Sequence, residues 1–188
     1  METTGSKLTD LSDTDLVRLA LEQNQAAFIV LYTRYNAGVK SHISRYVIQK
    51  EDVEDICLES FQKAFSQLAS YNPEYRFSTW IYRIATNEVL NHLRKFKVSS
   101  QMSHENAHDI LERKIDDDVH FNGNELQREL HKAIQRLPQK QRIVFNLRYF
   151  DEMKYEEISE ITGTSTGALK ASYHHAYNRI RKELEAIF

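Results

Sequence analysis

The chain has 188 residues, 41% of them apolar, with only five glycines and two prolines, which argues against a turn-rich β protein. Its formal net charge of −2 and pI of about 6.5 fall short of the strongly basic balance of a self-sufficient nucleic-acid-binding domain. One cysteine excludes an internal disulfide and a cysteine-rich zinc site, and no apolar run is long enough for a membrane span or marks a signal peptide. We therefore expect a soluble, cytoplasmic, all-α protein without a metal or cofactor.

Helical periodicity accounts for the first part of the chain, after residues 1–12, which we expect to be disordered. Apolar residues recur every three or four positions and predict helices over residues 13–23, 24–47 and 50–68. Ser12 is a suitable N-cap for the first helix and Asn24 for the second. The aromatic residues of the second helix are most simply explained as core.

The third predicted helix has a polar outer side that includes one leucine. Its outward positions are Asp55, Leu58, Glu59 and Gln62. Exposure to solvent is enough to explain why this side of the helix is polar. Leu58 stands among acids and amides, so it is the position at which we expect a partner surface.

An aromatic loop with one proline, residues 71–77, precedes a helix that we expect over residues 79–95, with Ser78 as its N-cap. One face of this helix carries Arg83, Asn87, Asn91 and Arg94, and Lys95 extends it. Such side chains can hydrogen-bond base edges and phosphates, and the rings of Tyr71, Tyr75 and Trp80 can stack on unpaired bases, at about 1–3 kcal/mol per base. The residues alone leave a second reading open, in which the rings are core and the face is solvated.

Residues 98–124 change in character, with serines, an acidic run at 116–118 and few apolar residues. We expect a flexible acidic linker there, between one domain over residues 13–97 and another over residues 125–188.

The second domain is predicted to contain four helices, over residues 125–137, 139–149, 156–162 and 165–184. Gly163 can adopt the left-handed conformation that ends a helix, and Ser165 can cap the next one, so the last two helices resemble a helix-turn-helix. The last helix carries Lys170, Ala171, His174 and Asn178 outward, and the second helix offers Arg142 and Arg148 for contacts. Packed helix pairs with a glycine turn also occur in proteins that never bind DNA, and basic residues near a helix C-terminus also complement its dipole.

The whole pattern resembles bacterial sigma factors of the extracytoplasmic function (ECF) group of the sigma-70 family. The segments that carry the resemblance are residues 54–61, 77–87, 137–150, 155–158 and 167–170. The resemblance implies a transcription initiation factor that binds core RNA polymerase and promoter DNA, with no small-molecule substrate. It also implies an anti-sigma factor as a further partner, often one in the inner membrane.

The resemblance assigns a role to each candidate residue. Docking on polymerase would use Asp55, Leu58, Glu59 and Gln62. Capture of single-stranded bases of the proximal (minus-ten) element would use Asn72, Tyr75, Arg76, Trp80, Arg83, Asn87, Asn91, Arg94 and Lys95. Contacts with the upstream (minus-thirty-five) element would use Arg148, Lys154, Lys170, Ala171, His174, His175 and Asn178. The family often has Gln at the position of Leu58, a departure that bears on docking. It often has Arg at positions 172, 175 and 177, so we expect weaker binding to free DNA here.

Two other classes of protein compete with this interpretation. An ordinary helix-turn-helix regulator would need high affinity for duplex DNA by itself and usually a dimer surface. A helical adaptor or anti-sigma-like protein would bind only proteins, and then Asn87→Ala or Lys170→Glu would have no effect on DNA. An enzyme is the least favoured class, because the sequence shows no nucleophile–base constellation and no phosphate-binding loop.

Overall fold

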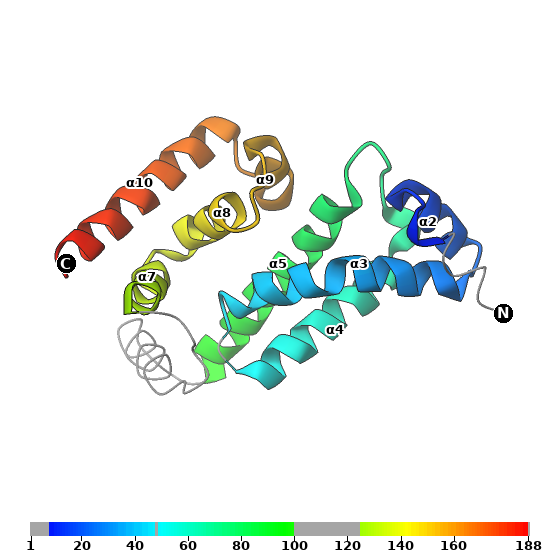
Figure 1. Cartoon of the computed structure of the whole chain (residues 1–188), viewed down its shortest axis with the longest axis horizontal. Coiled ribbons are helices and arrows are strands. Elements are labelled where there is room, and N and C mark those ends of the chain that lie inside the picture. The colour runs from blue at the N-terminus through cyan, green and yellow to red at the C-terminus, as the bar shows by residue number, and fades with distance from the viewer. Residues whose placement is uncertain (1–7, 48, 100–124, 188) are drawn as a thin grey trace. The chain divides into compact units, whose positions relative to one another are not determined.

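The computed structural model describes residues 8–47, 49–99 and 125–187, and every regular element in these ranges is a helix (Figure 1). The elements are α2 (Asp13–Leu21), α3 (Gln25–Ser44), α4 (Lys50–Ser66), the 3-10 turn η1 (Leu68–Ser70), α5 (Phe77–Ser99), α7 (Glu125–Gln135), α8 (Gln139–Tyr149), α9 (Tyr155–Thr162) and α10 (Thr166–Glu185). The all-α prediction is confirmed. The chain divides within α5 into two compact units, residues 1–90 and residues 91–188, and each has a core of its own. Within the described ranges, no helix is both long enough and apolar enough to cross a bilayer.

The first two helices of the N-terminal unit begin where their caps predict. The Ser12 hydroxyl accepts a hydrogen bond from the Asp15 amide at 3.1 Å, and the Asn24 side chain accepts from the Ala27 amide at 3.3 Å. Helix α2 ends at Leu21, two residues earlier than expected. The reason is that Gln23 has a φ of 65°, a left-handed conformation that no helix can continue.

Aromatic contacts hold α3 at the centre of the N-terminal unit, where it packs against both α2 and α4. The Phe28 ring of α3 meets the Phe65 ring of α4 at 4.9 Å, and the Tyr35 ring meets the Phe77 ring of α5 at 5.3 Å. Each such pair adds about 0.5–1.5 kcal/mol beyond the area that it buries. The aromatic stripe of α3 therefore is core, as expected.

Helix α5 begins at Phe77, so Ser78 lies in its first turn and the prediction of Ser78 as the N-cap is wrong. The Trp80 amide donates the first helical hydrogen bond to the Arg76 carbonyl at 3.2 Å. Phe77 is almost fully buried and packs on both Tyr35 and Tyr71. Burial of this ring fixes the helix start two residues before the position that the local capping pattern suggested.

Part of the segment predicted to be disordered makes defined contacts. Residues 1–7 lie outside the described part of the chain, but the carbonyl oxygens of Thr9 and Leu11 accept hydrogen bonds from the Arg34 guanidinium at 2.9 and 3.0 Å. The predicted linker lies almost entirely outside the described residues, since α5 runs on to Ser99 and the next described residue is Glu125.

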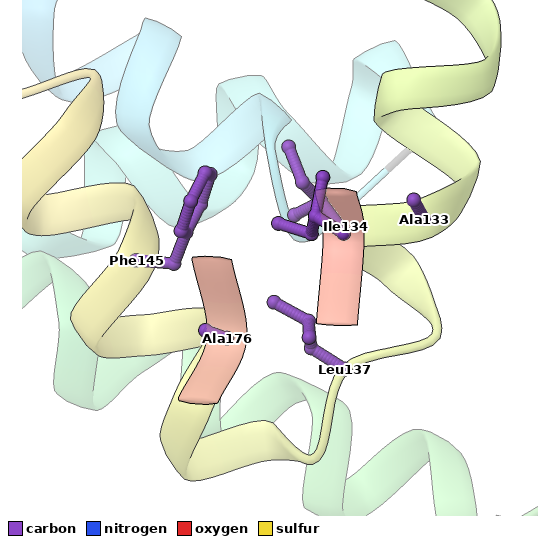
Figure 2. Packing of buried hydrophobic residues seen from close by; sticks show 6 residues of the cluster. Ala133, Ile134, Leu137, Phe145 and Ala176 are labelled. Carbon is purple, nitrogen blue, oxygen red and sulfur yellow. The ribbon is translucent and has the colours of Figure 1, made fainter. Parts of the chain in front are cut away.

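The core of the C-terminal unit lies between α7, α8 and α10. Figure 2 shows the side chains of this core, of which Ala133, Ile134, Leu137, Phe145 and Ala176 are labelled, and Ile180 belongs to the same cluster. Helix α8 has the predicted bounds, whereas α7 ends at Gln135 rather than at residue 137. The expectation that Arg142 is available for contacts is wrong. Arg142 is 8% exposed, and its guanidinium donates to the Gln135 side chain at 2.5 Å.

The helix-turn-helix forms as the sequence predicts. Gly163 has a φ of +66° and donates its amide hydrogen to the Ser159 carbonyl at 2.8 Å, which ends α9. The Ser165 hydroxyl accepts from the Ala168 amide at the start of α10. The apolar side of α10 buries Leu169, Ala176 and Ile180, so its other side is left outward.

Candidate nucleic-acid interface

A surface hollow of about 470 Å³ lies beside the loop that leads into α5. One part of its lining comes from Asp13 and Thr14 at the start of α2, another from Tyr35 of α3, and the rest from residues 71–78 with the exception of Asn72. Its volume falls in the range of sites that hold small ligands, about 300–1,000 Å³. Of the residues assigned to the proximal element, Tyr75 and Arg76 line this hollow.

Hydrogen bonds within the loop fix its shape. The Tyr71 hydroxyl donates to the Tyr75 carbonyl at 2.6 Å. The Asn72 side chain accepts from the Glu74 amide at 3.0 Å and donates to the Glu74 carboxylate at 3.0 Å. Asn72 is exposed but does not line the hollow, so its visible role is to hold the turn.

The three rings considered for base stacking have different surroundings. Tyr71 is only 9% exposed and packs on Phe77 at 5.7 Å. Trp80 is half-buried, with its ring 5.4 Å from that of Tyr71. Tyr75 is 48% exposed at the edge of the hollow, so it has the most accessible face for a stacked base.

Asp13 and Tyr35 are lining residues that sequence reasoning missed. The Tyr35 hydroxyl donates to the Asp13 carboxylate, which also accepts from Arg34 at 2.5 Å. Burial, together with the Asp13 carboxylate, raises the pKa of Tyr35 well above its usual range, so the hydroxyl stays protonated and keeps donating. In the sequence, Asp13 is only the first residue of a predicted helix, and Tyr35 is one of the aromatic residues of the next helix that we explain as core. Their partnership joins residues 22 apart, which no local periodicity reveals.

The polar face of α5 continues from the hollow along the helix. Arg83, Asn87, Arg94 and Lys95 are exposed, and Asn91 is half-buried. Steps of three and four residues keep most of them on one side of the helix. Arg94 donates to the Asn91 side-chain oxygen at 3.2 Å, which orients this end of the face. The predicted face therefore exists as an outward row of hydrogen-bond donors.

The predicted docking face of α4 is also outward. Asp55, Leu58, Glu59 and Gln62 are all exposed, and Leu58 has 53% of its surface accessible. Two ion pairs tie α4 to its neighbours, one between Lys40 and Glu54 and one between Lys63 and Glu88 at 2.6 Å. The face is thus an exposed helical surface with one apolar residue among polar ones.

The outward side of α10 carries most of the residues assigned to the upstream element. Lys170, Ala171, His174 and His175 are exposed, and Asn178 is half-buried with its side-chain nitrogen 2.9 Å from the His174 ring. His175 lies about 100° around the helix from His174 and about 40° beyond Ala171, outside the sector that the other four occupy. Four assigned residues therefore share one side of α10, with His175 at its edge.

Tyr155 lies between two of the assigned cations. The Arg148 guanidinium lies over its ring at 5.5 Å from the centroid, and the Lys170 ammonium lies at 5.8 Å. Arg148 also donates to the Met153 carbonyl at 2.9 Å. Lys154 is exposed at the N-cap of α9. The structure thus brings Arg148 and Lys170 to one ring, and Lys154 is its neighbour in the chain.

A row of stacked rings holds α10 on α8. The Phe145 ring is nearly parallel to the rings of Tyr149 and Tyr173, at 5.1 and 5.7 Å, and Tyr173 in turn stacks on Tyr177 at 6.5 Å. Burial raises the pKa of the Tyr173 hydroxyl. Tyr177 thus extends this row of rings along α10.

The described residues do not bring three or more His, Cys, Asp or Glu side chains together in a way that could hold a metal ion. His174 and His175 have ring centroids 6.2 Å apart and point in different directions. The chemistry that these surfaces offer is hydrogen bonding, ring stacking and charge.

Two family models match the chain in order. Sigma-70 region 2 matches residues 31–97, and sigma-70 region 4 matches residues 127–180. The chain is 31% identical over 185 residues to an ECF RNA polymerase sigma-E factor of Salmonella typhimurium, covering 94% of this chain and 96% of that protein. It is 27% identical over 189 residues to an RNA polymerase sigma-H factor of Pseudomonas aeruginosa, covering 96% of this chain and 97% of that protein.

Solved structures show the same fold. CnrH, solved in complex with the cytosolic domain of CnrY, is similar with a TM-score of 0.70 and 22% identity, over 93% of this chain and 97% of CnrH. The sigma factor RpoE of Bartonella quintana, solved with the anti-sigma factor NepR, is similar with a TM-score of 0.65 and 18% identity, over 84% of this chain and 96% of RpoE.

Proposed function

The chain belongs to the ECF group of the sigma-70 family of RNA polymerase sigma factors, and we propose that it binds core RNA polymerase, directs it to specific promoters and opens them. One observation carries this proposal. Regions 2 and 4 of the family both match, in order, in a chain that aligns over nearly its whole length with ECF sigma factors. Such a factor starts transcription by binding and orienting its partners, and on this proposal the chain catalyses no reaction itself. It acts in the cytoplasm, with the polymerase.

The exposed face of α4 supports a docking role on core polymerase. Asp55, Glu59 and Gln62 surround Leu58 on a helix that two ion pairs hold in place. A partner surface with an apolar contact for Leu58 and basic groups for the acids would fit this face. In this scheme the polymerase provides much of the affinity for DNA, which explains how a chain with a net charge of −2 functions at promoters.

The hollow and the outward face of α5 support the capture of unpaired bases from the proximal element. Taking a base out of a duplex costs a few kcal/mol, and stacking with pocket contacts repays it. Tyr75 offers an exposed ring at the hollow, and Arg83 and Asn87 offer donors on the helix that follows. We assign this role to the predicted domain of residues 13–97.

The outward side of α10 supports reading of the upstream element as a duplex. A major groove admits one helix, and Lys170, Ala171 and His174 lie on the side that would face base edges. Arg148 and Lys154 lie near the start of α9, where phosphate contacts would set the register. We assign this role to the predicted domain of residues 125–188, joined to the first by the predicted linker of residues 98–124.

We also propose regulation by an anti-sigma factor. CnrH and RpoE, which share this fold, were each solved with a protein partner, and the partner of RpoE is named as an anti-sigma factor. An inhibitor that covers the α4 face or the outward side of α10 would block the polymerase or DNA contacts proposed here.

The direct test is capture of core RNA polymerase by the purified chain, followed by run-off transcription from a genomic promoter pool with and without it. We expect stable binding and new, discrete start sites. Failure to bind a polymerase from the matched species, combined with tight binding of the chain alone to duplex DNA, would favour an ordinary regulator instead. Loss of both activities would favour a protein-binding adaptor.

A pair of variants separates docking from promoter opening. Leu58→Glu should weaken polymerase binding, because it puts a charge at the apolar contact, whereas Asn87→Ala should impair opening and leave binding intact. Leu21→Glu is the matched control, since Leu21 is also an exposed leucine but lies on α2. Equal loss of both activities in Leu58→Glu and Asn87→Ala would contradict this division of roles.

A further inference from the structure

Arg34 makes an unusual set of contacts for an exposed arginine of α3. Its guanidinium donates to the Asp13 carboxylate at 2.5 Å and to the carbonyl oxygens of Thr9 and Leu11 at 2.9 and 3.0 Å. The partners lie 21 to 25 residues earlier in the chain. One side chain therefore ties the segment before α2, and the first residue of α2, to the middle of α3.

The tied segment ends in the lining of the hollow. Asp13 and Thr14 are lining residues, whereas Arg34 itself is not. The Asp13 carboxylate also accepts from the Tyr35 hydroxyl, and Tyr35 lines the hollow as well. Without Arg34, two backbone carbonyls would lose their donor and Asp13 would lose its charged partner, so the α2 side of the hollow would no longer be held by α3.

The lining favours a base over a phosphate as the occupant. Asp13 and Glu74 bring two carboxylates to the hollow, and these repel an anionic phosphate. The exposed Tyr75 ring supplies a stacking surface, which any base can use. Arg76 also lines the hollow, at a position where it can meet the backbone of the same strand.

We propose that Arg34 is a positioning residue for the capture of an unpaired nucleobase. It makes no DNA contact of its own, but it holds Asp13, which lines the hollow, and the backbone of Thr9 and Leu11 just before it. The inference rests on the proposed function, since it takes the hollow as the site for a base of the proximal element. When the wall of the hollow is already fixed, DNA binding does not have to supply the free energy of ordering it. Loss of that order therefore weakens binding although no contact with DNA is removed.

The test is a double-mutant cycle between Arg34 and single bases of the DNA. Full-length chain and core polymerase are combined, and the affinity of the holoenzyme is measured for a labelled single-stranded oligonucleotide of the proximal element. The sequence is taken from a promoter found in the run-off pool. A matched series replaces one base at a time by an abasic site, which removes the ring and keeps the backbone.

We expect one position at which the abasic site weakens binding to the wild type by about 5- to 150-fold, the equivalent of one stacked base. Arg34→Ala should weaken binding to the intact oligonucleotide by a similar factor, and the abasic site at that position should then cost the variant little more. The affinity of Arg34→Lys for the intact oligonucleotide should lie between those of the wild type and Arg34→Ala. An ammonium keeps the charge but cannot serve all three acceptors in the geometry of a guanidinium.

Arg18→Ala is the matched control. Arg18 is an arginine of α2 with a highly exposed side chain, and its ion pair with Asp15 is long, at 3.7 Å. This variant should bind every oligonucleotide as the wild type does. Thermal unfolding followed by circular dichroism checks that each variant folds, and if Arg34→Ala does not, the cycle is run with Arg34→Lys, for which the same non-additivity is expected.

The proposal is overturned if the losses from the Arg34 variant and from the abasic site simply multiply at every position. It is also overturned if Arg34→Ala weakens polymerase binding as much as oligonucleotide binding, since that is the signature of general destabilisation. If the wild type fails to bind polymerase or to produce start sites, the proposed function itself is wrong, and the role of Arg34 falls with it.

Discussion

The two units present their proposed DNA-binding residues in opposite ways. In the N-terminal unit, hydrogen bonds fix the residues around the hollow. The Tyr71 hydroxyl donates to the Tyr75 carbonyl, the Asn72 side chain accepts from the Glu74 amide, and the Arg34 guanidinium donates to the Asp13 carboxylate. In the C-terminal unit, the assigned residues of α10 stand outward on a helix surface. The difference suits two tasks, binding of an unpaired base and binding of a duplex. A fixed hollow suits one unpaired base, whereas an outward helix suits the repeating groove of a duplex.

The largest expected effect concerns the ring packing on which the outward helix depends. Phe145→Ala should lower the free energy of unfolding of the C-terminal unit by about 3–5 kcal/mol, because it removes a buried ring that stacks on both Tyr149 and Tyr173. Urea unfolding by circular dichroism measures the loss. Fluorescence of Trp80, the single tryptophan, follows the N-terminal unit and should keep its transition. An equal shift of both transitions would show that the units are not independent cores.

Filling the hollow should give the next largest effect. Thr14→Phe places a ring at the lining, so promoter opening should fall by about 5- to 150-fold, the value of one stacked base, while polymerase binding stays unchanged. Permanganate reactivity of unpaired thymines measures opening. Thr33→Phe, at an exposed position of α3 that does not line the hollow, is the control. If the Thr14→Phe variant opens promoters as the wild type does, the hollow is not the site that captures a base.

Salt dependence should distinguish the two surfaces. Lys170→Ala should reduce the slope of log affinity against log salt by about one for duplex carrying the upstream element, because one phosphate contact is lost. Asn87→Ala removes no charge and should leave that slope alone. Lys182→Ala, an exposed cation about 120° from Lys170 around α10, is the control for total charge. The assignment fails if Lys182→Ala changes the slope as much as Lys170→Ala.

A smaller effect is expected at Tyr155. Tyr155→Leu should weaken binding to the upstream element by about 2- to 5-fold, since a ring–cation contact at an exposed site is worth about 0.5–1 kcal/mol. Tyr155→Phe keeps the ring under Arg148 and Lys170 and should bind almost as the wild type does. Fluorescence anisotropy with the holoenzyme measures both. If Tyr155→Phe and Tyr155→Leu weaken binding equally, the contribution of Tyr155 comes from its hydroxyl and not from its ring.

The smallest effect on promoter binding is expected at the thiol beside the docking residue Leu58. Burial raises the pKa of Cys57 from 9.0 to about 11, so at pH 8 the folded chain should react with iodoacetamide far more slowly than the chain in urea. The same shift makes Cys57 favour the folded state below pH 9, and that contribution is lost as pH rises towards 11, because the unfolded thiol ionises first. Cys57→Ala should lack this pH dependence. Equal labelling rates in the two states would show that α4 does not shield the thiol.

Local chemistry made most of the fold predictable. Ser12, Asn24 and Ser165 cap helices because each side chain satisfies an amide only two or three residues away. Gly163 ends α9 because its own conformation allows it. The outward positions of α4 and α10 followed from the 3.6-residue repeat, so Leu58 and Lys170 are exposed as expected.

The parts that the sequence did not reveal depend on residues distant in the chain. Burial of Phe77 by Tyr35 moved the start of α5, and pairing with Gln135 took Arg142 out of reach of a partner. Asp13, on the wall of the hollow, is held by Arg34 from more than twenty residues further along the chain. Periodicity describes which side of a helix is buried, but it does not say which element covers it.

The most direct test of the division between hollow and outward helix is footprinting of one promoter by three holoenzymes, with DNase protection of the upstream element and permanganate reactivity of the proximal element read together. With wild type we expect both signals. Thr14→Phe should keep upstream protection and lose proximal reactivity. Lys170→Ala should weaken upstream protection, while the holoenzyme that does bind keeps its proximal reactivity. Loss of both signals together in both variants would contradict the assignment of separate tasks to the two units.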